Sequence, residues 1–166
     1  SATPVEWIEC FISDGGSLVG LTDTIEISVN NESLLGGLFF EIEDFPDVLV
    51  GESVLTTERT DGWSLSILDD NGKISIAGFG PLAGADPLQP GDGPVCRVVV
   101  RPQGDQSLTV SLTMTDVQIQ DISSPPVQLN WTSEPGVYEV GIETQFIMLT
   151  DGSAAPGAQM NSSMCL

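Results

Sequence analysis

The stretch that most constrains the fold is residues 62–79, two alternating apolar runs joined by Asn71-Gly72. Asn-Gly between such runs predicts a two-residue hairpin, because both central positions of a type I′ turn need a positive φ angle. One face of this hairpin is apolar and consists of Trp63, Leu65, Ile67, Ile74 and Ile76. A hairpin with one apolar face packs that face against a second sheet. The stretch therefore predicts a β-sandwich whose other hairpin face is open to water or to a partner.

The rest of the chain continues the β pattern and shows no apolar period of 3.6 residues. Alternating or β-branched residues predict strands at 4–13, 24–30, 37–43, 52–58, 95–101, 107–119, 127–131, 136–140 and 142–149. Gly15-Gly16 is expected to turn the chain, and Phe45-Pro46-Asp47-Val48-Leu49 to form a corner with apolar anchors. Residues 80–94 are rich in proline and glycine, so a loop without a strand is expected there.

The chain divides into a sandwich and a tail. Residues 1–140 are expected to form the sandwich, and residues 141–166 an extra strand followed by a C-terminal tail of small and polar residues.

Charge and the absence of histidine limit the functions open to this chain. Its 24 acidic residues against 4 basic ones give a formal charge of −20, which repels nucleic acid and anionic membranes. No apolar run approaches the roughly 20 residues that span a bilayer, so no membrane insertion is expected. Without histidine, Ser-His-Asp, Cys-His and HExxH chemistries are excluded. We therefore expect neither an enzyme nor a nucleic-acid-binding protein.

The three cysteines leave the redox state open. Cys10 and Cys96 lie on apolar faces of expected strands, where they either pair across the core or serve as small hydrophobic residues. Cys165 lies in the tail and is the best placed for a disulfide between chains, or for one with Cys10 that ties the tail to the first strand.

Acidic turns make calcium a candidate cofactor. Asp69, Asp70 and Asn71, and separately Asp116 and Asp121, offer the oxygen ligands that Ca²⁺ prefers. Asp-Asp-Asn-Gly is also the composition of a tight turn, and we favour that interpretation. The metal-binding residues are therefore left unknown.

Two other kinds of site are weaker alternatives. Glu58 and Asp61 flank Arg59 and are the residue types of a glycosidase pair, although solvated surface charges are the favoured interpretation. Carbohydrate binding is the weakest alternative, with Trp131 and Tyr138 as its aromatic candidates.

Several blocks, in their order along the chain, resemble cohesin modules. They are Phe-x-Ile-x-x-x-Pro-x-Val-Leu from Phe40 to Leu49, the Asn71-Gly72 hairpin, and Pro90-Gly91-Asp92-Gly93-Pro94 before a β-branched strand. The resemblance covers roughly residues 5–140. It implies an all-β fold, a jelly-roll β-sandwich of about nine strands, to which this chain adds a C-terminal strand and tail.

The resemblance also implies a partner. In cohesins one sheet face binds a dockerin, a small calcium-loaded helical module, and the matching strands here are residues 37–43, 62–68, 73–79 and 107–116. The outward positions of these strands are the expected partner-binding residues: Phe39, Glu41, Ser64, Ser66, Lys73, Ser75, Phe79, Thr109 and Ser111, with Glu43, Ala77 and Thr113 beside them. The expected function is an extracellular, non-catalytic protein-binding module that binds a dockerin-like partner.

Apolar residues at outward positions favour self-assembly as the alternative. Phe39 and Phe79 are partner anchors unless a loop or the tail covers them. Trp7 and Phe11 form a second such pair, which either meets a neighbouring copy or is covered by residues 142–149. The alternative function is a structural subunit of an extracellular fibre or surface assembly, bound to other copies through strand exchange or terminal segments. Both functions place the chain outside the cell or at its surface.

Overall fold

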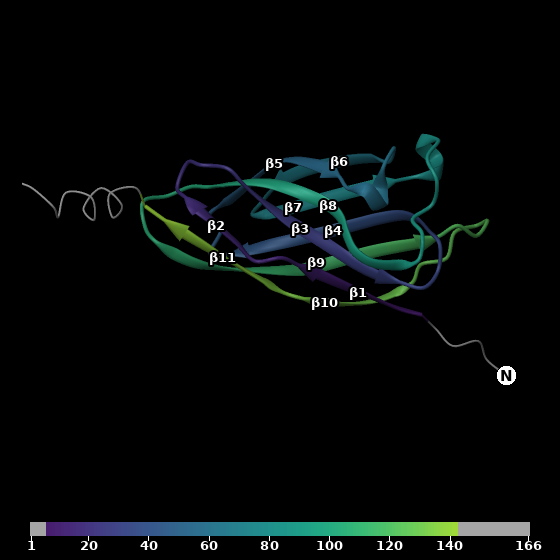
Figure 1. The fold of residues 1–166 in the computed structure, drawn as a ribbon. Helices are drawn as coiled ribbons and strands as arrows, with labels where there is room; N and C mark the ends of the chain where they lie inside the picture. The colour runs from purple at the N-terminus through teal and green to yellow at the C-terminus, as the bar shows by residue number, and fades with distance from the viewer. Residues whose placement is uncertain (1–5, 143–166) are drawn as a thin grey trace, which may run out of the picture.

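Two β-sheets packed face to face make up the computed structural model, which describes residues 6–142 (Figure 1). The strands are β1 (Trp7–Ile12), β2 (Gly15–Leu18), β3 (Asp23–Asn31), β4 (Leu35–Phe45), β5 (Leu49–Thr56), β6 (Ser64–Asp70), β7 (Lys73–Phe79), β8 (Gly91–Pro102), β9 (Leu108–Asp121), β10 (Asn130–Glu134) and β11 (Gly136–Gly141). Two short 3-10 helices are η1 (Glu58–Thr60) and η2 (Pro81–Ala83). The all-β sandwich is confirmed, with eleven strands in the described residues.

Two pairs of consecutive strands, β1–β2 and β10–β11, pass from the five-stranded sheet to the six-stranded sheet side by side. The five-stranded sheet has the order β10-β1-β3-β8-β5, and the six-stranded sheet the order β2-β11-β9-β4-β7-β6. β1 and β10 are parallel in one sheet, and β2 and β11 are parallel in the other. A Cβ atom on Gly136 would lie 2.8 Å from the carbonyl oxygen of Ser13, so the connection from β10 to β11 has room only for glycine at this position. The expectation of a simple turn at Gly15-Gly16 is wrong, since β2 begins there.

The hairpin forms as expected between β6 and β7. Asn71 and Gly72 have φ angles of 53° and 75°, as a type I′ turn requires. Ile74 and Ile76 are buried, as is Trp63 just before β6. Leu65 and Ile67 are only half-buried, because β6 is the edge strand of the sheet.

Inward side chains of both sheets form one apolar core, and both described cysteines belong to it. Cys10 and Cys96 are buried free thiols in the same sheet, on β1 and β8 with β3 between them. The pairing of Cys10 with Cys96 is therefore wrong, and their role as small hydrophobic residues is confirmed. Burial raises the pKa of each thiol to about 12. Cys165 and its expected disulfides lie outside the described residues, as do the expected strand 142–149 and the tail.

Two expectations about loops need correction. β8 begins at Gly91, so the end of the 80–94 segment is a strand, and Leu88 is a fully buried residue that bridges to Leu35. In the corner at residues 45–49, Leu49 is buried as an apolar anchor, but Phe45 is not an anchor, because its side chain is 76% exposed. The buried carboxylate of Asp44 holds this corner, since Oδ2 accepts hydrogen bonds of 2.7 Å from the amides of Val48 and Leu49.

Candidate functional site

The candidate site is the face of the six-stranded sheet that points away from the core, called the outer face below. β9, β4, β7 and β6 lie side by side in it, and no further layer of residues 6–142 packs on it (Figure 1). Because side chains alternate along a strand, burying Phe40 and Ile42 turns Phe39 and Glu41 outward. The same alternation places every expected partner-binding residue on this face: Phe39, Glu41, Ser64, Ser66, Lys73, Ser75, Phe79, Thr109 and Ser111. Their role in binding stays a prediction.

One end of the outer face is apolar. The strand register places Phe39 beside Ala77 and Gln118, and Phe79 beside Ser64 and the side-chain-free Gly37. A hollow of about 260 Å³ results, lined by Gly37, Leu38, Phe39, Ala77, Phe79, Gln118 and Gln120. The two phenylalanines expected as anchors therefore line a common concavity.

The middle of the outer face carries its only cation among the described residues, Lys73. Its Nζ lies 3.3 Å from Oε1 of Glu41, and Thr115 Oγ1 donates a 2.8 Å hydrogen bond to the same oxygen. The hydrogen bond from Thr115, and secondly the bond and charge of Lys73, lower the pKa of the Glu41 carboxyl. Ser75 lies directly opposite Glu41 on the neighbouring strand.

The remaining expected residues lie near the margins of the face. Thr109 donates a 2.8 Å hydrogen bond to Glu139 of β11, and Ser111 lies between Phe45 and Val137. Ser64 and Ser66 lie on the edge strand β6. The outer face is therefore wider than the expected residues alone, and it extends onto β11.

Several residues of the outer face were not among the expected partner-binding residues. Leu68 is 63% exposed and Phe45 points the same way, and both continue an outward alternation that the sequence displays. Gln118 and Gln120 are different, because a bulge in β9 opposite Glu41 and Ile42 shifts the alternation by one residue. No sequence signal marks that bulge.

Residues of the calcium and carbohydrate alternatives make other contacts in the described part of the chain. The carboxylate of Asp69 accepts a 2.7 Å hydrogen bond from the Gly51 amide, and Asp121 accepts bonds from the amides of Ser123 and Val127. Within residues 6–142, no three acidic or cysteine side chains are grouped to hold a metal ion. Tyr138 is fully buried and bonds Ser17 Oγ at 2.7 Å, so it offers no surface to a sugar.

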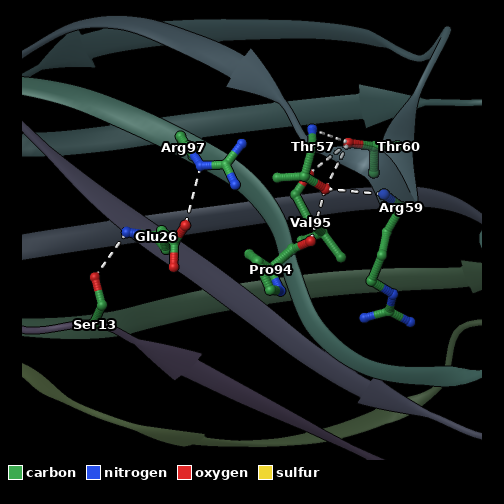
Figure 2. Close-up of polar contacts among 8 residues, drawn as sticks. All are labelled: Ser13, Glu26, Thr57, Arg59, Thr60, Pro94, Val95 and Arg97. Atoms are coloured by element: carbon green, nitrogen blue, oxygen red, sulfur yellow. Dashed lines mark hydrogen bonds and ion pairs between the residues drawn. The ribbon is translucent and has the colours of Figure 1, made fainter.

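The segment around Arg59 is structural. Thr57 and Thr60 donate hydrogen bonds of 2.7 Å to the carbonyls of Pro94 and Val95, which fix η1 against β8 (Figure 2). Arg59 donates to backbone carbonyls and to Asn31 rather than pairing with Glu58 or Asp61. The guanidinium of Arg59 therefore binds these acceptors and not the two carboxylates that flank it in the sequence.

The opposite face of the sandwich is the outer side of the five-stranded sheet. Arg97 pairs with Glu26 at 3.0 Å, and Arg101 pairs with Glu52 at 2.6 Å (Figure 2 shows the first pair). Trp7 is 59% exposed on this side, near Phe11 on the same strand. No helix among residues 6–142 is long and apolar enough to cross a membrane.

Comparison with known proteins finds similar proteins by structure alone. No protein-family model and no curated protein matches the sequence. A non-cellulosomal cohesin from the archaeon Archaeoglobus fulgidus superposes with a TM-score of 0.66 at 14% identity, covering 88% of this chain and 99% of that one. The structure of a type I cohesin–dockerin complex, Coh-OlpC–Doc435 from Clostridium thermocellum, gives 0.66 at 11% identity, covering 86% and 99%. CaCohA2 from Clostridium acetobutylicum gives 0.64 at 17% identity, covering 82% and 92%. The chain has the cohesin-type β-sandwich fold.

Proposed function

We propose that this chain is a non-catalytic protein-binding module whose outer face holds a dockerin-like helical module. The observation that carries the proposal is the uncovered face itself, which collects all the expected partner-binding residues on four adjacent strands. Similar folds have been solved as cohesin–dockerin complexes, which supports the same kind of partner. The polar middle and the apolar end of the face match the usual anatomy of an interface.

A non-catalytic role fits the chemistry of the face. It offers hydroxyl groups, amides and carboxylates on a sheet, and its hollow of about 260 Å³ is lined mainly by apolar residues and glutamines. Histidine is absent from the chain, and the buried thiols of Cys10 and Cys96 are withdrawn from solvent. A scaffold or surface module of this kind works outside the cell, and any calcium requirement would come from the dockerin-like partner.

Calorimetry with purified dockerin modules of the source organism tests this function. Titrations with excess calcium should show binding, and titrations with a chelator should not. Phe79→Asp should weaken binding about tenfold or more, since it places an unpaired charge in the interface. Leu21→Asp is the matched control, because Leu21 is an exposed apolar residue outside the outer face. Absence of binding to every dockerin, or equal effects of the two variants, would refute the proposal.

A second candidate, self-association into a fibre or surface assembly, is favoured by the exposed Trp7. This side chain is 59% exposed and lies beside β10, the five-residue edge strand of its sheet. A strand from another copy could extend that edge. Sedimentation velocity and electron microscopy test it: concentration-dependent growth that Trp7→Ser abolishes would support it, and a monodisperse monomer at high concentration would remove it.

A further inference from the structure

An apolar groove runs off one end of the outer face. The hollow beside Phe39 and Phe79 adjoins a second hollow of about 200 Å³, and the two share Phe79 and Gln120 in their walls. The second hollow lies between η2 and the 121–127 loop, and Pro81, Leu82, Ile122 and Pro126 help to line it. Both of these segments lie at the same end of the sandwich (Figure 1).

Two glycines in β4 keep this groove open. A Cβ atom on Gly37 would lie 3.4 Å from Oε1 of Gln120 and 3.7 Å from Cδ1 of Phe79, and one on Gly36 would lie 3.5 Å from Cγ2 of Ile122. Neither glycine has a positive φ angle, so the backbone here accepts other residues. The space therefore depends on the missing side chains and not on an unusual turn.

The rim of the groove is strongly apolar for a solvated surface. Leu82 is 88% exposed, Ile122 is 49% exposed and Phe79 is 43% exposed. Single exposed apolar residues are ordinary, but a cluster around a concavity is typical of an interaction site.

The other half of the outer face is acidic. It carries Glu41, Glu43, Asp70, Asp116 and Glu139 against Lys73, five carboxylates against one ammonium, a formal charge of −4. Lys73 is already paired with Glu41. With −20 on the whole chain, the same face of a second copy is repelled, so charge complementarity requires a cationic partner.

We propose that the groove and the acidic half together select a cationic amphipathic helix of a partner protein. This inference rests on the protein-binding role of the outer face and specifies the chemistry of the partner. An apolar side chain of the helix lies in the groove beside Phe39 and Phe79, and Lys or Arg side chains lie over Glu43 and Asp70. Phe39 and Glu43 are four residues apart on one strand, roughly 13 Å. A helix aligned with the strands covers that distance in about nine residues.

Two synthetic peptides test the chemistry of the partner without any dockerin. Both are alanine-based helices of about 18 residues with leucines on one face. About nine residues after the leucines, one peptide carries arginines and the other carries glutamates at the same positions. Titration into the ¹⁵N-labelled full chain should shift the amides of Ala77, Phe79, Gln118 and Glu43 with the cationic peptide only. Raising NaCl from about 50 mM to about 500 mM should weaken this binding. Equal shifts with both peptides, or shifts outside the outer face, would overturn the proposal.

Two variants separate the apolar and the charged contributions. Gly37→Leu fills the groove without a change of charge and should weaken the cationic peptide about tenfold. Glu43→Lys should weaken it by a similar factor, whereas Glu134→Lys, the same charge change on the other sheet, should have little effect. Unfolding curves of each variant confirm that the fold is retained, and Gly37→Ala replaces Gly37→Leu if the larger residue disrupts it. Unchanged affinity in the folded groove variant contradicts the proposal.

The dockerin titrations remain an independent result. If the cationic peptide binds the groove and no dockerin binds, the dockerin function fails while the assigned partner chemistry stands. If a dockerin binds with no sensitivity to Gly37→Leu, Glu43→Lys or salt, the partner chemistry fails while the dockerin function stands.

Discussion

The indole ring of Trp63 lies directly against the backbone of Gly80. A Cβ atom added to Gly80 would fall 2.3 Å from Cε2 of the ring, well inside van der Waals contact. A hydrogen bond also fixes the ring, because Nε1 donates to the carbonyl of Asp86 at 2.9 Å. This contact joins the start of β6 to the 80–90 loop and supports the edge strand of the outer face.

Gly80→Ala should therefore destabilise the protein by about 1–3 kcal/mol, because a rigid ring cannot move aside cheaply. Urea unfolding followed by tryptophan fluorescence measures the change. Gly37→Ala is the control, since its Cβ would make no contact shorter than 3.4 Å, and it should change stability little. Similar losses in the two variants would mean that the close approach to Trp63 is not the cause.

The guanidinium of Arg59 joins three separate segments. It donates to the carbonyls of Val29 at 2.6 Å, Gly93 at 2.9 Å and Gln89 at 3.0 Å, and to Oδ1 of Asn31 at 2.6 Å. Lysine has neither the planar fork nor enough donors to satisfy this set.

Arg59→Lys should cost about 2–3 kcal/mol of unfolding free energy, because acceptors are left without partners. Hydrogen exchange should also accelerate at the first residues of β8. Arg97→Lys is the matched control, since the Arg97–Glu26 pair is about 40% exposed and should contribute less than about 1 kcal/mol. Equal effects of the two substitutions would contradict a special role for Arg59.

The sequence predicts the sandwich and most of its outer face for a simple physical reason. Where one face of a strand is buried, the alternation of side chains determines which residues lie on each face. If the side chains of Phe40 and Ile42 point into the core, those of Phe39 and Glu41 must point outward. The Asn71-Gly72 turn sets the register of β6 and β7 in the same local way.

Features that depend on contacts far apart in the chain could not be predicted. β2 has only four residues, Gly15–Leu18, and exists because β11 supplies a parallel partner. The groove forms where Gly36 and Gly37 lie next to the 121–127 loop and η2. The alternation of residues within one strand does not predict which other segments lie beside it. The structural role of Asp44 could not be predicted for the same reason, since its burial follows from the loop that folds over it.

The thiols of Cys10 and Cys96 should be unreactive in the folded protein. Both are free and buried, and burial raises the pKa of each to about 12, so the thiolate that reacts with labelling reagents is scarce. In a Cys165→Ser variant, Cys10 and Cys96 are the only thiols of the chain. A maleimide should label neither of them in native buffer and both in denaturant. Rapid native labelling would contradict their place in the core.

The Asp44 carboxyl gives stability an unusual dependence on pH. Its side chain is buried, Oδ2 accepts from the Val48 and Leu49 amides, and Oδ1 has no hydrogen-bond partner. Burial raises its pKa above the ordinary value of 3.8, and the two amide hydrogen bonds offset part of the rise. A raised pKa means that the folded state holds more protons than the unfolded state between the two values. The contribution of the neutral carboxyl is therefore complete below pH 3.8 and is lost as pH rises through the folded pKa.

Asp44→Asn removes the ionisation and keeps an oxygen for the two amides. The unfolding free energy of the wild type minus that of this variant should fall as pH rises from about 3 to about 7, as urea unfolding at a series of pH values will measure. Asp44→Ala removes the acceptor as well and should destabilise at every pH by about 1–3 kcal/mol, because two buried amides lose their partner. A difference between wild type and Asp44→Asn that grows with pH would show that the folded protein favours the charged carboxylate, with the hydrogen bonds outweighing burial.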